Sequence, residues 1–102
     1  MINRAKRKML GGKPAVGAEV SLGSTLSAEI IAPLGVNFVL VDNQHGNWAD
    51  QASILAYRSI VIGGSVPIER VRKYDFGLIG RLLDNGSRGV VVPMVNNADE
   101  AE

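Results

Sequence analysis

The 102-residue sequence contains no cysteine and only one histidine. Without cysteine, a disulfide framework, a thiolate nucleophile and a cysteine-ligated metal site are excluded. No apolar run approaches the ~18 residues of a membrane-spanning helix, so we expect a cytoplasmic protein with no membrane partner. Nucleotide-binding glycine loops are also missing, because Gly11-Gly12-Lys13 lacks the preceding glycine of a P-loop and no Gly-x-Gly-x-x-Gly occurs. With 46% hydrophobic and 21% charged residues, the composition is that of a globular domain.

Positive charge is concentrated at the N-terminus. Residues 1–13 contain five basic residues and no acid, whereas the remainder has six basic and ten acidic residues. Such an arm can bind nucleic acid or a membrane surface, or serve as a transit peptide. We favour a short amphipathic helix with Ile2, Ala5 and Met9 on one face, because no aromatic residue is interleaved with the cations and the segment lacks serine. We therefore expect no nucleic-acid partner.

Four apolar, β-branched segments recur along the chain at intervals of roughly 23 to 28 residues, the length of a strand, a loop and a helix. They span residues 15–21, 38–42, 66–71 and 90–95. These runs are mostly continuous rather than alternating, which is typical of parallel strands buried on both faces.

Helical patterns with their own start and stop signals lie between the strands. Their predicted caps are Ser24 or Thr25, Asn47, Asp75 and Asn97, and the first three helices are predicted over residues 25–34, 48–62 and 76–84. In the third helix we expect Phe76, Ile79, Leu82 and Leu83 to face inward. The sequence therefore predicts an α/β fold, a helix followed by four βα units, in one domain of residues 1–102 with 1–13 as a basic helical arm.

Three chemically useful side chains lie at strand ends or in the helices between strands. His45 follows the second strand, Arg70 closes the third, and Asp84 lies in the helix before the fourth. Separately, His45 is typical of a solvated loop, Arg70 of a surface ion pair, and Asp84 is unfavourable at a helix C-terminus. Together, a carboxylate beside the imidazole would raise its basicity, and a guanidinium would stabilise a developing enolate oxygen. The spacing alone leaves open whether the three residues meet.

Several short motifs give the chain a specific resemblance. They are Asp42-Asn43-Gln44-His45-Gly46, Val92-Pro93-Met94-Val95-Asn96 and the segments 67–71 and 82–86. In this order and spacing, the sequence resembles the metal-dependent 2-oxo acid aldolases of the 4-hydroxy-2-oxoheptanedioate and 2-dehydro-3-deoxyglucarate type, which are related to the citrate lyase β-subunit. The resemblance covers essentially the whole chain. It implies the N-terminal half of a (β/α)8 barrel, which needs roughly 250 residues.

The resemblance also implies a chemistry. The family cleaves or forms a carbon–carbon bond between pyruvate and an aldehyde through a metal-bound enolate. His45 would transfer the proton, oriented by Asp84; Arg70 would hold the 2-oxo oxygen, and Gln44 would help to bind substrate. The implied partners are a small 2-oxo acid and an aldehyde, and the implied cofactor is a divalent metal such as Mg²⁺ or Mn²⁺, acting as Lewis acid.

The sequence departs from the family at several positions. Gln44 stands where the family has Glu, residues 71–75 differ, and Glu69 replaces an apolar residue, which would be costly if its charge were buried unpaired. The two carboxylate metal ligands of the family come from later strands without counterpart here. We therefore assign no metal ligand and expect the isolated chain to lack aldolase activity.

An alternative to catalysis stays open. A half-barrel exposes two strand edges and an apolar interior surface, which favour association. The chain would then be a non-catalytic half-barrel that forms a homo-oligomer or pairs with a complementing chain.

Overall fold

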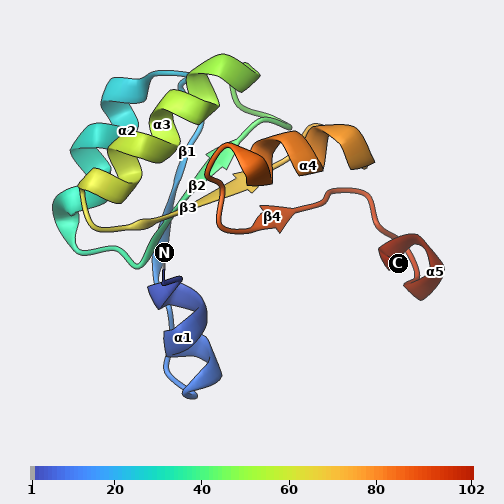
Figure 1. Cartoon of the computed structure of the whole chain (residues 1–102), viewed down its shortest axis with the longest axis horizontal. Coiled ribbons are helices and arrows are strands. Elements are labelled where there is room, and N and C mark those ends of the chain that lie inside the picture. The colour runs from blue at the N-terminus through green and yellow to red at the C-terminus, as the bar shows by residue number, and fades with distance from the viewer. Residues whose placement is uncertain (1) are drawn as a thin grey trace.

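Four parallel strands form one sheet in residues 2–102, which are the residues that the computed structural model describes (Figure 1). The strands are β1 (Gly17–Val20), β2 (Phe38–Asp42), β3 (Val66–Arg70) and β4 (Val90–Val91), and they lie side by side in that order. Every neighbouring pair is parallel. The predicted α/β fold with a four-stranded parallel sheet is confirmed.

The helices between the strands cover one face of the sheet, and one further helix lies at each end of the chain. They are α1 (Arg4–Leu10), α2 (Thr25–Ile31), the 3-10 helix η1 (Ala32–Leu34), α3 (Asp50–Ile62), α4 (Phe76–Asp84) and α5 (Ala98–Ala101). Figure 1 shows α2 and α3 packed side by side, with α1 and α5 projecting away from this layer. Each crossover returns the chain so that all four strands end at the same edge of the sheet.

The core lies between the sheet and this helical layer. Val39 and Val41 of β2 are fully buried, whereas the alternate residues Phe38 and Leu40 are only half-buried. Successive side chains of a strand point to opposite faces, so the helices cover only one face. The other face, which the family resemblance implies is the interior of a barrel, stays partly open.

Capping side chains begin α4 and α5 where the sequence indicates. The Asp75 carboxylate accepts a hydrogen bond from the Leu78 backbone N–H at 3.0 Å, and Asn97 caps α5 in the same way through Glu100. After η1, Gly35 takes a left-handed φ of 97°, which ends the helical segment. The cap predictions at Asp75 and Asn97 are confirmed, and Ser24 takes the N-cap position of α2 without a side-chain cap hydrogen bond.

The second predicted helix begins two residues too early. We expected Asn47 to cap a helix from Trp48, but α3 begins at Asp50 after Ala49. Trp48 instead stays in the loop, with its ring buried and its indole N–H donated to the Val20 carbonyl oxygen at 2.9 Å. A tertiary hydrogen bond thus overrides the local pattern.

Two helices bury less than their apolar patterns predict. In α4, Leu82 is buried, but Phe76 is 89% exposed because it lies in the first turn, where α4 begins beyond the end of β3. In α1, Ala5 is buried, whereas Ile2 and Met9 are exposed. Leu83 of α4 is likewise 43% exposed. The inward placement of Phe76 and Leu83 and the shared face of α1 are therefore wrong.

The last strand is shorter than the apolar run 90–95. It ends at Val91, and two residues later Pro93 has no N–H to offer a strand partner. Met94 then takes a positive φ of 62°, a conformation incompatible with an extended strand.

None of the helices in residues 2–102 has both the length and the apolar character needed to cross a membrane.

Candidate active site

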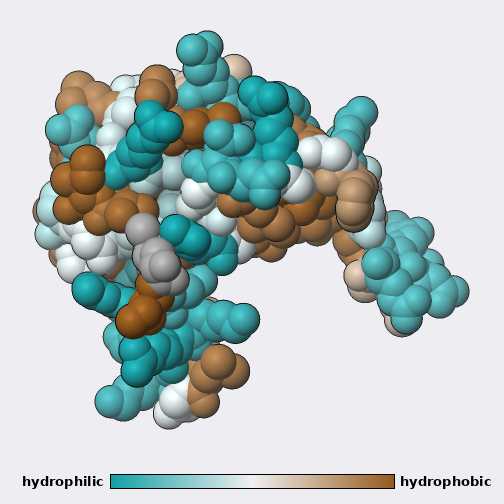
Figure 2. All heavy atoms as spheres, in the orientation of Figure 1, coloured by the Kyte–Doolittle hydropathy of each residue, from teal (hydrophilic) through white to brown (hydrophobic). Residues whose placement is uncertain are grey.

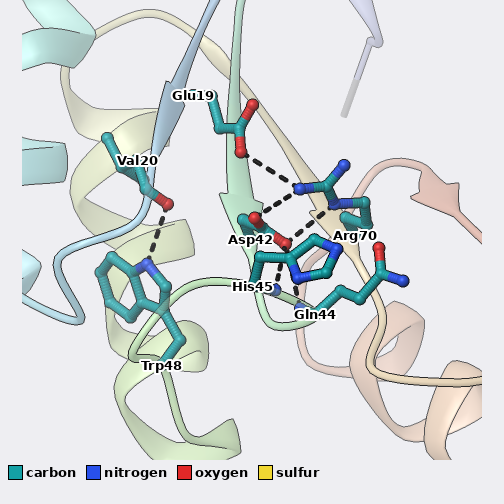
Figure 3. A network of polar contacts seen from close by, with 7 residues as sticks. All are labelled: Glu19, Val20, Asp42, Gln44, His45, Trp48 and Arg70. Carbon is teal, nitrogen blue, oxygen red and sulfur yellow. Dashed lines mark hydrogen bonds and ion pairs between the residues drawn. The ribbon is translucent and has the colours of Figure 1, made fainter. Parts of the chain in front are cut away.

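A partly buried ion pair marks the carboxyl end of the sheet (Figure 3). Asp42 closes β2 and Arg70 closes β3, and the two residues are register partners. Arg70 donates from Nε to Asp42 Oδ1 at 2.9 Å and from Nη2 to Asp42 Oδ2 at 2.5 Å. Because this contact is bidentate, it fixes the plane of the guanidinium as well as its position.

The same pair fixes two charges. Asp42 is only 1% exposed. The Arg70 guanidinium lowers the pKa of Asp42 well below its usual range, against the opposing effect of burial, and the backbone N–H groups of His45 and Gln44 lower it further. The hydrogen-bonded Asp42 carboxylate in turn raises the pKa of Arg70. The site therefore holds a permanent cation.

Part of this cation is open to a ligand. Nη2 of Arg70 also contacts Glu19 Oε1 of β1 at 3.3 Å. Within residues 2–102, Nε and Nη2 thus have protein partners, whereas Nη1 has none. Figure 3 shows this third nitrogen pointing away from both carboxylates. With its side chain 26% exposed, Arg70 presents Nη1 to the open face, where it can donate to an oxyanion.

The loop that carries His45 is built on the same carboxylate. Asp42 Oδ1 accepts hydrogen bonds from the backbone N–H groups of Gln44 at 2.9 Å and of His45 at 3.2 Å. Gly46 follows, where any Cβ would collide with the Asp42 carbonyl oxygen. One side chain therefore orients the guanidinium and the turn that presents the imidazole.

Further contacts attach this loop to the end of β1. The Asn47 N–H donates to the Ser21 carbonyl oxygen at 2.9 Å, beside the hydrogen bond from Trp48 to Val20. Gly23 packs so closely against Asn47 that a side chain there would overlap its backbone. The loop is thus held from β1 and from β2.

The His45 imidazole is exposed beside the ion pair, and Gln44 is half-buried (Figure 3). Neither side chain has a protein hydrogen-bond partner in the described part of the chain. Both side chains are free to meet a ligand at this edge. The structure thus brings His45, Gln44 and Arg70 to one edge of the sheet, and their catalytic and binding roles stay predictions.

Asp84 lies elsewhere. It is the last residue of α4, which runs back from the end of β3, and its side chain is exposed. The next two residues, Asn85 and Gly86, line a pocket together with Ile62 at the C-terminus of α3. The His45 loop leads into the other end of α3, its N-terminus. Within residues 2–102 no hydrogen bond joins Asp84 to His45, so a pairing inside one chain has no support here, and the role of Asp84 stays a prediction.

Two residues of the site were not predicted as site residues, although Asp42 was named within the motif of residues 42–46. Asp42 is the central acceptor of the site and Glu19 the second carboxylate on Arg70. The signal for Asp42 was its place at the end of one strand while Arg70 ends the next, which puts them opposite each other once the strands pair in register. Glu19 carried no comparable signal.

Glu69, the unusual acid in β3, is paired but only on one side. It is fully buried on the helix-facing side of the strand, and the Tyr57 hydroxyl donates to its Oε2 at 2.6 Å. Burial raises the pKa of Glu69 to about 8, while the hydrogen bond from Tyr57 acts in the opposite direction. Its Oε1 has no partner among the described residues.

The donor set at this edge does not fit a divalent metal. Within residues 2–102, no group of three or more His, Asp or Glu side chains is placed to hold one. Both oxygens of Asp42 are already hydrogen-bonded to Arg70.

Comparison with known proteins identifies relatives of this chain. No protein-family model matches the chain. It is 36% identical over 101 residues to the 4-hydroxy-2-oxo-heptane-1,7-dioate aldolase of Escherichia coli, covering 99% of this chain and 38% of that protein. The chain is a homologue of these aldolases.

Other comparisons agree. The hydroxypyruvate/pyruvate aldolase of Agrobacterium fabrum is 32% identical over 99 residues, covering 97% of this chain and 37% of the relative. A crystal structure of an HpcH/HpaI aldolase/citrate lyase family protein from Burkholderia cenocepacia superposes with a TM-score of 0.89 at 27% identity, over 98% of this chain and 40% of the other. The chain thus spans less than two fifths of the length of the curated relatives, and it corresponds to part of their fold.

Proposed function

We propose that this chain supplies the enolate-stabilising and proton-transfer groups of a lyase that cleaves or forms aldols of 2-oxo acids. The observation that carries this proposal is the guanidinium of Arg70, clamped by Asp42 with Nη1 left open beside the His45 loop. Homology to named aldolases supports the reaction class. The substrates are then a small 2-oxo acid and an aldehyde.

Each group has a defined task in the cleavage direction. An imidazole nitrogen of His45 takes the proton from the C4 hydroxyl of the aldol, and the C3–C4 bond breaks to release the aldehyde. The electron pair moves to the C2 oxygen, and Arg70 Nη1 stabilises the resulting enolate by a charge-assisted hydrogen bond. His45 then returns a proton to C3, which completes pyruvate. Gln44, half-buried in the same loop, would hydrogen-bond the substrate.

The family resemblance adds a divalent cation of the Mg²⁺ or Mn²⁺ type, which would polarise the 2-oxo group when bound. The described residues offer no ligand set for it. We therefore propose that residues 1–102 form one domain, with 1–13 as an arm, that lacks aldol turnover by itself. Pyruvate-dependent aldol addition with added Mn²⁺ tests this: turnover well above that of His45→Ala would refute it.

Ligand binding tests the site without turnover. Oxamate has the shape of pyruvate, and we expect calorimetric titration to detect weak binding to the chain. Arg70→Lys keeps the charge but loses the planar fork that Asp42 holds, so we expect at least about a tenfold loss of affinity. His45→Gln, the matched change at the proton-transfer position, should bind oxamate nearly as well as wild type. Equal affinity in wild type and Arg70→Lys would contradict the proposal.

A second function has its own observation. The open face of the sheet carries the half-buried Phe38, Leu40 and Ile68 and the 44% exposed Val91, and β1 and β4 are its edges. Figure 2 shows further apolar surface on the side of the molecule turned to the viewer. Such surfaces favour self-association or pairing with a complementing chain. Sedimentation velocity separates the cases, since a dilute stable monomer would exclude obligate self-association.

A further inference from the structure

Glu19 is the least explained group at the Arg70 site. It lies in β1 in register with Leu40 of β2, on the open face that also carries Asp42 and Arg70. Its carboxylate extends across β2 to the end of β3, where Oε1 lies 3.3 Å from Arg70 Nη2 (Figure 3). A strand that does not pair with β3 thus places a second acid on the same guanidinium.

The two acids on Arg70 are not equivalent. Asp42 is 1% exposed, makes two hydrogen bonds to the guanidinium and also holds the loop, so it already fixes Arg70 in place. The Glu19 side chain is 47% exposed and makes one longer contact. Holding Arg70 therefore does not require Glu19, and its carboxylate lies on the same open face of the sheet as Arg70.

Charge decides what this second acid does. Asp42, Glu19 and Arg70 together carry a formal charge of −1, whereas Asp42 and Arg70 alone would be neutral. A ligand that binds Nη1 shares one guanidinium with Glu19, whose carboxylate contacts the neighbouring Nη2, and two like charges on the same guanidinium repel each other. A carboxylate can only accept hydrogen bonds, so it suits a ligand hydroxyl and opposes a ligand carboxylate.

We propose that Glu19 sets the charge selectivity of the Arg70 site, admitting a singly charged 2-oxo acid with a neutral or hydroxylated partner and disfavouring ligands that bring a second negative charge. This inference rests on the proposed function, because it takes Arg70 as the group that binds the 2-oxo acid. It makes Glu19 a specificity-determining residue rather than a catalytic one.

The test compares oxamate, with one charge, and oxalate, with two. Binding is followed by NMR at the Arg70 Nε–H and the backbone amides of residues 42–46, so that anions on the basic arm do not contribute. In Glu19→Gln we expect both ligands to bind more tightly, and the ratio of oxalate to oxamate affinity to rise about fivefold, as expected for removing one nearby, partly screened charge. Glu19→Asp keeps the charge and should keep the ratio close to that of wild type.

The outcomes separate this inference from the proposed function. Measurable oxamate binding with an unchanged ratio in Glu19→Gln overturns the role of Glu19 and leaves the proposed function standing. Sulfate serves as a second probe: if oxamate binds to neither protein but sulfate binds more tightly to Glu19→Gln, the charge role of Glu19 stands and the proposed function fails. Binding of no anion to either protein overturns both.

Discussion

Two buried carboxyl groups lie one register position apart in the sheet and have opposite environments. Asp42 is 1% exposed on the open face of β2, and Glu69 is 0% exposed on the helix-facing side of β3. Asp42 is held by a guanidinium and two backbone N–H groups, whereas Glu69 receives one hydroxyl hydrogen bond and leaves Oε1 unpartnered in the described residues. Burial alone therefore does not decide whether a carboxyl group is charged; its partners decide.

The comparison gives opposite effects of pH on stability. The pKa of Asp42 is lowered, so its contribution is present above the ordinary value of 3.8 and is lost as the pH falls below it. The pKa of Glu69 is raised from 4.5 to about 8, so the folded state holds a proton that the unfolded chain releases. Between pH 4.5 and about pH 8, the contribution of Glu69 to the unfolding free energy therefore falls as the pH rises.

The largest expected effect comes from removing the cation that distinguishes Asp42. Arg70→Gln removes the charged partner of Asp42 and leaves only its two backbone N–H hydrogen bonds, so we expect a clear loss of unfolding free energy. Urea denaturation at pH 7 measures this loss. Arg72→Gln is the matched control because it breaks an exposed pair with Asp50, at 2.8 Å, and should change stability by less than about 1 kcal/mol. Equal losses of unfolding free energy in Arg70→Gln and Arg72→Gln would show that the Asp42–Arg70 pair stabilises the fold no more than an exposed ion pair.

The next largest effect is the dependence of the unfolding free energy on pH that Glu69 causes. Wild type should lose on the order of 2 kcal/mol of unfolding free energy between pH 5 and pH 8. The reason is that Glu69 stays protonated to higher pH in the folded state than in the unfolded chain. In Glu69→Gln, which has the same shape but no titrating group, we expect this slope to flatten and the variant to be the more stable protein at pH 8. Parallel pH profiles in the two proteins would show that Glu69 is not held protonated.

The smallest effect concerns the single partner of Glu69. Tyr57→Phe removes the hydroxyl that donates to Oε2 and should lower the unfolding free energy by about 1 kcal/mol at pH 7. Because that hydrogen bond lowers the pKa of Glu69, the variant should also shift the Glu69 titration to higher pH. A carbon-detected NMR titration of the labelled carboxyl group measures the shift; a titration moved to lower pH would contradict the assigned role.

Local signals predicted the elements well, because they depend on neighbouring residues. The bounds of β2 and the caps at Asp75 and Asn97 follow from apolar runs and from side chains that bond their own backbone. Trp48 was misplaced because its partner, the Val20 carbonyl, is distant in sequence.

The site was less predictable, because strand register brings it together. His45 and Arg70 were found by their positions at strand ends. The acid that joins them, Asp42, and the acid that crosses from β1, Glu19, depend on which residues lie opposite one another in three strands. The pairing of Asp84 with His45 came from resemblance alone, and the path of α4 separates the two residues within one chain.

The most direct test of the central claim is a residue-level map of where oxamate binds, obtained by titrating the isotopically labelled chain and following its amide and guanidinium signals. The account predicts shifts confined to residues 42–46 and to the Nε–H of Arg70, and their loss in Arg70→Lys. Shifts confined to the basic arm at residues 4–13, or a pattern unchanged in Arg70→Lys, would contradict it.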